Sequence, residues 1–111
     1  MHRTQLAYAK AKALADTLDA ERKRRTPPMP ANPTDADIDA RVEADCAIET
    51  ELGYWPAWEA LHRAELAMLE WAAGTIKQNS PERWAQVAPV FATYNPTIRP
   101  KVIDLAFRLK A

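Results

Sequence analysis

Glycine is scarce in this chain, with two residues among 111, whereas proline occurs nine times. Tight β-hairpin turns usually require glycine, so a sheet built from such hairpins is disfavoured. Alanine, glutamate, arginine and leucine are abundant, and all four favour helices. No segment shows the strict apolar–polar alternation of a half-buried strand. The sequence therefore predicts an all-α protein with four or five helices and no strands.

The length suits one compact domain, and a hydrophobic fraction of 48% is sufficient for a core. The exception to helical patterning is residues 26–34, where four prolines forbid a helix and favour an extended, semi-rigid chain. We therefore expect a single helical domain over residues 1–111, in which the Pro-rich linker at 26–34 separates the first helix from the rest.

The centre of the fold is predicted to be an antiparallel helical hairpin of residues 35–52 and about 56–78. Thr34 is a favourable N-cap for its first helix, and Gly53 is a favourable C-terminal stop. Pro56 suits the first position of the next helix. So few residues connect the two helices that they are expected to lie antiparallel.

Further helices are predicted on both sides of this hairpin. Residues 4–25 form the first, with an alanine-rich face, and Ser80-Pro81 begin a fourth helix. Pro100 opens a short last helix whose apolar residues cover most of its circumference, which indicates burial or a partner. The apolar face expected for the first helix consists of Ala7, Ala11, Leu14 and Leu18, with Tyr8 and Ala15 beside it.

Both helices of the hairpin carry ionisable residues where their pattern calls for apolar ones. Asp45 and Glu49 continue a stripe that begins with Ile38 and Val42, and Glu65 interrupts the stripe of the following helix, with His62 at its edge. A buried carboxylate costs free energy unless it is paired. Facing helices that present carboxylates and a histidine could form a metal site for iron, manganese or zinc. One hairpin supplies half of a two-metal centre, which would then require a symmetric dimer.

Ion pairing is the favoured alternative to metal binding. Arg41 and Arg63 lie near the same hairpin and can neutralise Asp45 or Glu65 as buried pairs. Two further alternatives are that the stripe near the turn is solvated, or that its carboxylates face another protein. Cys46, the only cysteine, excludes an intramolecular disulfide and is expected to be a small buried side chain.

Charge is unevenly distributed although the net charge is zero. Residues 1–25 have a balance of +4, residues 26–70 of −8 and residues 71–111 of +4. Such segregation can steer contacts between copies or with a charged partner. Phosphate contact is an alternative for the one dense basic cluster, but neutral chains are not typical nucleic-acid binders. The cluster consists of Arg22, Lys23, Arg24 and Arg25.

Catalytic and cofactor motifs are missing from the sequence: there is no phosphate-binding glycine loop, zinc cysteine set or dinucleotide fingerprint. No apolar stretch is long enough for a signal or a membrane span, so we expect a cytoplasmic protein. The favoured hypothesis is a non-enzymatic interaction or assembly subunit that binds a protein partner or itself through its first and last helices. Alternatives are a small helical subunit of a ribonucleoprotein assembly and a metal-binding hairpin. Candidate partner contacts are Trp71, Ile103 and Phe107.

Overall fold

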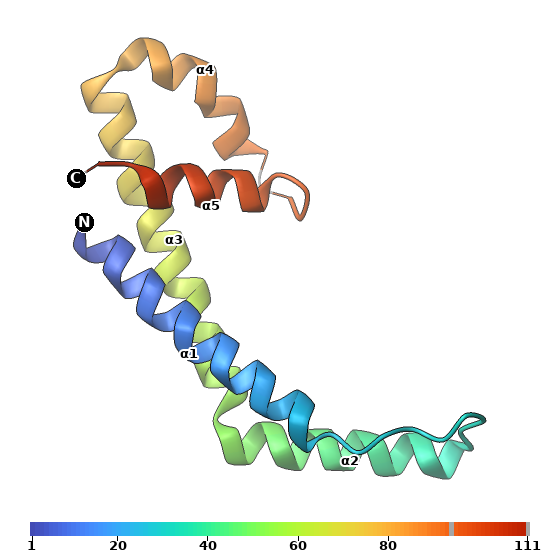
Figure 1. Cartoon of the computed structure of the whole chain (residues 1–111). Coiled ribbons are helices and arrows are strands. Elements are labelled where there is room, and N and C mark those ends of the chain that lie inside the picture. The colour runs from blue at the N-terminus through green and yellow to red at the C-terminus, as the bar shows by residue number, and fades with distance from the viewer. Residues whose placement is uncertain (94, 111) are drawn as a thin grey trace. The chain divides into compact units, whose positions relative to one another are not determined.

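The computed structural model describes residues 1–93 and 95–110, and this part of the chain contains five α-helices and no strand (Figure 1). The all-α prediction is confirmed, and the contacts are consistent with the predicted helical hairpin of the second and third helices. The helices are α1 (Arg3–Arg25), α2 (Asp35–Leu52), α3 (Tyr54–Asn79), α4 (Pro81–Ala92) and α5 (Arg99–Arg108).

The chain divides into two compact units. The terminal unit comprises Met1–Lys10 and His62–Ala111, and therefore holds the start of α1, most of α3, α4 and α5. The central unit comprises Ala11–Leu61, and holds the rest of α1, the Pro-rich linker, α2 and the start of α3. Each unit contains its own set of buried residues.

Capping interactions fix both ends of α2, as the sequence predicts. The Thr34 hydroxyl accepts a hydrogen bond from the Asp37 backbone N–H at 3.2 Å, and the Asp37 carboxylate accepts one from the Thr34 N–H at 2.9 Å. This reciprocal pair satisfies two backbone donors at the start of α2 and holds the pKa of Asp37 below its usual value. At the other end Gly53 adopts the left-handed conformation (φ 65°, ψ 36°), which ends α2 and permits the turn into α3.

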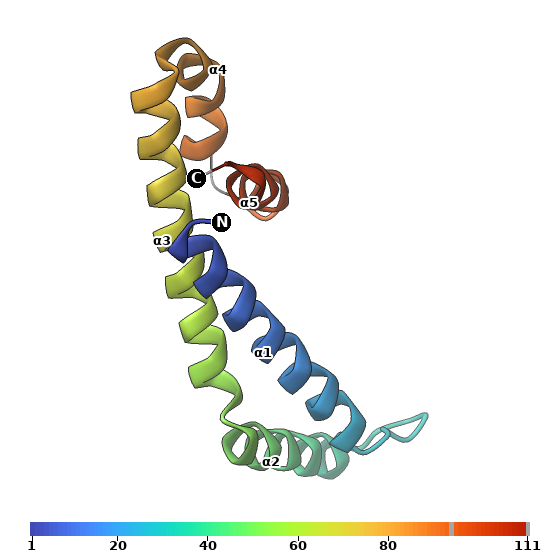
Figure 2. The same ribbon diagram turned by 60° about the vertical axis from the view of Figure 1, so that its left-hand side comes forward.

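The core of the terminal unit is built where the N-terminal end of α1 and the C-terminal end of α5 lie side by side (Figure 2). Gln5 is buried and donates through Nε2 to three carbonyl oxygens at the end of α5, those of Ala106, Phe107 and Leu109, at 3.0, 3.0 and 2.7 Å. The last carbonyl groups of a helix are incompletely paired within it, and of these three the Ala106 oxygen also accepts from the Leu109 N–H at 3.4 Å, so Gln5 acts as a C-terminal cap supplied by another helix. The other buried side chains of this unit are those of Tyr8, Glu65, Met68, Leu69, Ala72, Ile76, Val102 and Ala106.

The sequence pattern predicts an apolar stripe along α3, and all of its members except Trp58, which is half-buried, are buried in the structure. The buried members are Leu61, Glu65, Leu69, Ala72 and Ile76. The face predicted for α1 is wrong by a rotation about the helix axis. The residues that α1 buries are Gln5, Tyr8 and Ala15, while Leu14 remains 54% exposed. The rotation follows from the two contacts with α5, the Gln5 cap and the packing of Tyr8 on Phe107.

Burial in the central unit is sparse and lies on α1 and α3, where Ala15, Tyr54, Ala57 and Leu61 are covered. None of the eighteen described residues of α2 is buried. Ile38 and Val42, predicted as the start of its apolar stripe, are 45% and 56% exposed, and Cys46, expected to be buried, is exposed. The Pro-rich linker runs along α2, and Arg41 Nη1 donates to the Pro27 carbonyl oxygen at 3.2 Å (Figure 1). The later part of the predicted stripe is therefore occupied by polar contacts, in which Asp45 pairs with Arg41 and Glu49 with Arg22 of α1, whereas Ile38 and Val42 stay exposed.

The two glycines offer a matched test of the turn at Gly53. An added Cβ would meet no atom within 4 Å at Gly53 or at Gly74, so both substitutions report backbone conformation alone. Gly53→Ala should lower the free energy of unfolding by about 1 kcal/mol, because a side chain is strained at positive φ. Gly74→Ala, inside α3, should raise it by up to about 1 kcal/mol through helix propensity. Urea unfolding measures the change in the free energy of unfolding for both variants. Changes of the same sign would contradict the left-handed conformation assigned to Gly53.

Candidate functional site

The four residues of the predicted metal site belong to two different units. Asp45 and Glu49 lie in the central unit, whereas His62 and Glu65 lie in the terminal unit. Among the described residues, no group of three or more histidine, cysteine, aspartate or glutamate side chains is arranged to hold a metal ion. The structure instead gives each of the three carboxylates an arginine partner within its own unit. His62 is exposed on α3.

Glu65 has the most demanding environment of the four, because its side chain is completely buried. The Arg99 guanidinium, at the first residue of α5, pairs with both carboxylate oxygens: Nε donates to Oε2 at 3.2 Å and Nη2 donates to Oε1. A bidentate pair of this kind is among the stronger charge-assisted interactions and fixes orientation as well as distance. The sequence identified Glu65 as a residue that needs a partner, but the partner is Arg99 rather than Arg63.

Asp45 has the partner that the ion-pair alternative proposes. Arg41 Nε contacts both of its carboxylate oxygens, at 3.3 and 3.2 Å, one turn away on the same helix. The Asp45 side chain is 27% exposed, so it lies at the boundary of the helix surface rather than in a core. An i,i+4 pair in this setting stabilises α2 by only a few tenths of a kcal/mol.

Glu49 lies at the centre of a polar network that joins α1, α2 and α3 within the central unit. Its oxygens accept from Arg22 Nη1 at 3.0 Å and from the Trp55 indole N–H at 2.8 Å. The Arg22 guanidinium also lies over the Tyr54 ring, 4.9 Å from its centroid, and Tyr54 donates to Asp19 at 3.1 Å. Burial and this hydrogen bond raise the pKa of Tyr54. The network takes the place that apolar packing would have between α1 and α2.

The basic cluster Arg22–Arg25 is largely neutralised by acidic neighbours. Arg22 pairs with Glu49, and Lys23 pairs with Asp19 at 3.0 Å. Arg24 and Arg25 share Glu21, and Arg25 also reaches Glu51 at 3.3 Å. The four cations thus face four carboxylates, those of Asp19, Glu21, Glu49 and Glu51. A phosphate backbone would have to compete with these ion pairs, so the cluster presents far less net charge than its sequence suggests.

The predicted partner-contact residues are each partly covered inside the terminal unit. The Trp71 ring stacks on His2, with 4.2 Å between ring centroids and an interplanar angle of 6°. Phe107 meets Tyr8 edge to face at 5.9 Å. Ile103 and both of these aromatic residues remain half-buried, so part of each surface is still available and their role in partner binding stays a prediction.

Two side chains that hold the terminal unit together, Gln5 and Arg99, have contacts that the sequence does not predict. Gln5 was missed because a lone glutamine near a chain end carries no pattern that distinguishes a cap from a solvated side chain. Arg99 had a weak signal, since it directly precedes Pro100 and so begins the last helix. Its pairing with a residue 34 positions earlier is a tertiary property.

Comparison of the chain with protein-family models, with curated proteins and with solved structures finds no match. Within the described residues, no helix combines the length and the hydrophobicity that crossing a membrane requires.

The buried pair can be tested within α5, which offers its own control. Arg99→Ala should lower the free energy of unfolding by about 3 kcal/mol, because it deprives a buried carboxylate of its guanidinium. Replacing both residues, Glu65→Leu with Arg99→Leu, should recover part of this loss. Arg108→Ala removes only an exposed pair with Asp104 and should cost less than about 1 kcal/mol. Equal losses for Arg99→Ala and Arg108→Ala in chemical denaturation would refute the assignment.

Acid should weaken the fold through Glu21. Hydrogen bonds from Arg24 and Arg25 lower the pKa of Glu21 from 4.5 to about 2. Because the folded pKa is depressed, this stabilisation is present above pH 4.5 and is lost as the pH falls towards 2. The midpoint temperature of thermal unfolding should fall as the pH is lowered through this range. The fall should be less steep in Glu21→Gln. Glu59→Gln, an exposed residue of the same unit without an ion pair to the described residues, should leave the slope unchanged.

Proposed function

We propose that this chain is a non-enzymatic helical assembly subunit that associates with further copies of itself. The observation that supports this most is the exposure of α2, none of whose eighteen described residues is buried. Most of the stability of a protein helix comes from packing one of its faces. The apolar residues Ile48 and Leu52 are only half-buried, so a helix of this length still has surface available for another molecule.

The available face of α2 is both apolar and acidic. Ile38 and Val42 are four residues apart, so they lie on one side of the helix, and about half of each side chain is exposed. The helix has seven acidic residues and one arginine, a net charge of −6. A partner that covers this face must therefore offer apolar contact together with positive charge.

A second copy of the chain meets this requirement. Residues 71–111 have six basic and two acidic residues, and the net charge of the whole chain is zero, so copies do not repel one another. Contact between α2 of one copy and a basic surface of the next joins two different surfaces. Such a head-to-tail contact closes into a ring or extends as a chain. Opposite charge sets the orientation, and the apolar side chains supply buried area.

The ribonucleoprotein alternative depends on Arg22, Lys23, Arg24 and Arg25. Because each of these side chains already has a carboxylate partner, we rank nucleic-acid binding below self-association. The metal-binding alternative requires residues from both units and has no group of ligands within the described residues to support it.

Sedimentation velocity over a range of concentrations tests the proposal. The wild-type chain should sediment as a species larger than the monomer at low salt and dissociate as salt rises, because opposite charges are screened. Ile38→Ser combined with Val42→Ser should raise the dissociation constant about tenfold or more, corresponding to a loss of about 1.4 kcal/mol of apolar contact.

Leu66→Ser is the matched control, because Leu66 is a similarly exposed apolar residue (47%) on α3 in the other unit. It should leave association unchanged, and circular dichroism should show the same helix content in all variants. A wild-type chain that stays monomeric at every concentration and salt level would remove the proposal. If Leu66→Ser weakened self-association as much as the double substitution does, α2 would not be the contact surface.

A further inference from the structure

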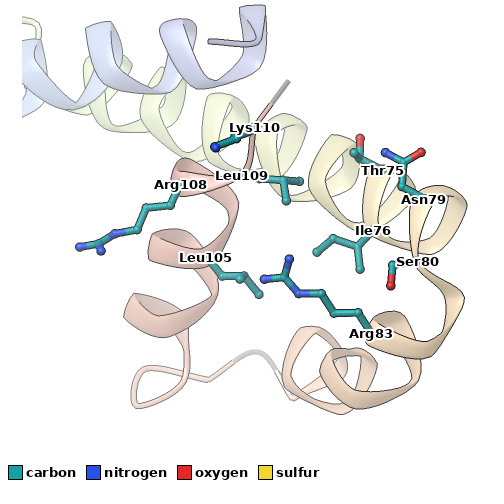
Figure 3. Close-up of a pocket in the computed structure, with 9 residues that line it drawn as sticks. All are labelled: Thr75, Ile76, Asn79, Ser80, Arg83, Leu105, Arg108, Leu109 and Lys110. Atoms are coloured by element: carbon teal, nitrogen blue, oxygen red, sulfur yellow. The ribbon is translucent and has the colours of Figure 1, made fainter.

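The terminal unit has a cavity of about 370 Å³ between the end of α3, the start of α4 and α5 (Figure 3). This volume lies within the range of about 300–1,000 Å³ that is usual for small-molecule sites. Its lining combines three apolar side chains, three neutral polar ones and three cations, and no acidic residue. The lining residues are Thr75, Ile76, Asn79, Ser80, Arg83, Leu105, Arg108, Leu109 and Lys110.

Arg83 is the residue of this cavity that is best placed to bind a ligand. Figure 3 shows its guanidinium directed across the cavity towards Leu105 and Ile76, whereas Arg108 points away from the other lining residues. Arg83 makes no ion pair or side-chain hydrogen bond with the residues that the structure describes. Lys110 likewise has no such partner among them. Arg108, in contrast, pairs with Asp104.

The apolar part of the cavity comes from α3 and α5. Ile76 is buried, and Leu105 and Leu109 are half-buried, so they form a hydrophobic surface beside the guanidinium. Ser80 is the N-cap residue of α4, but its hydroxyl makes no capping hydrogen bond and remains available as a donor. The cavity thus places a guanidinium and a hydroxyl next to an apolar surface.

We propose that this cavity binds a small amphipathic anion, an apolar chain or ring that ends in one carboxylate. The guanidinium of Arg83 is weakly hydrated and has a planar set of donors that matches a carboxylate bidentately. The apolar body of the ligand lies against Ile76, Leu105 and Leu109, where it replaces water. The absence of carboxylates from the lining residues disfavours cationic ligands, and the small volume excludes a folded macromolecule.

Binding can be measured with octanoate by NMR titration of the full-length chain. Octanoate should change the chemical shifts of the backbone amides of Ser80, Arg83, Leu105 and Leu109. The amide chemical shifts of α2 should not change. Octanol, which has the same chain length without the charge, should bind about tenfold or more weakly, because a hydrogen bond to a charged group commonly contributes at least that factor. Acetate, which has the charge without the chain, should not saturate the site.

Arg83→Gln should weaken octanoate binding about tenfold or more. Arg63→Gln is the matched control, since Arg63 is an exposed arginine of the same unit that lies outside the cavity. It should bind octanoate with wild-type affinity. Three results would each overturn the proposal: no saturable shift with octanoate, octanol binding as tightly as octanoate, or equal octanoate affinity in Arg83→Gln and the wild type. Because the basic surface proposed for self-association also comes from residues 71–111, the titration is done at a salt concentration at which the chain sediments as a monomer.

Discussion

A fully buried carboxylate, that of Glu65, is the constraint on which the terminal unit depends. An ionised carboxylate without a cation would be strongly unfavourable in that position, so a basic side chain must reach the buried face of α3. The first residue of α5 supplies it, and the two-point contact fixes where α5 begins. Gln5 then fixes where α5 ends, because it takes up the carbonyl oxygens of the last turn. The apolar contacts of α5, including those of the buried residues Val102 and Ala106, lie between the ion pair at its start and the glutamine cap at its end.

In the central unit α1 and α3 bury a small apolar core, whereas α2 is joined to them by ion pairs and hydrogen bonds at half-exposed positions. Arg22, Glu49, Tyr54 and Trp55 join three helices, but pairs of this kind contribute little net stability when solvent reaches them. Association would add the apolar burial that α2 lacks, which is why we connect its exposed face with assembly rather than with catalysis.

The segregation of charge along the sequence has two physical outcomes in the structure. At the end of α1 the basic residues are paired with carboxylates of the same unit, so a cluster that is dense in sequence is close to neutral in space. Near the cavity, Arg83 and Lys110 have no carboxylate partner among the described residues. Charge that is left uncompensated next to an apolar surface is better suited to recognition than charge that is already paired.

Sequence alone determined the five helical segments and both caps of α2. The Thr34 cap, the Gly53 stop and the buried stripe of α3 follow from local backbone preferences and from a 3.6-residue period, which act over a few residues. It also identified Asp45, Glu49 and Glu65 as carboxylates that need partners, and Arg41, which pairs with Asp45, is one of the two arginines it offered as partners.

Tertiary structure alone decided the longer-range choices. It selected Arg99 for Glu65, turned α1 towards Gln5 and Tyr8, left α2 without a fully buried residue and brought Arg83 beside Leu105. These contacts join residues between 22 and 104 positions apart, as Arg83 with Leu105 and Gln5 with Leu109 illustrate. The physical reason is that helix propensity and capping are set by neighbouring residues, whereas the partner of a buried charge depends on which distant segment the folded backbone brings within hydrogen-bond distance.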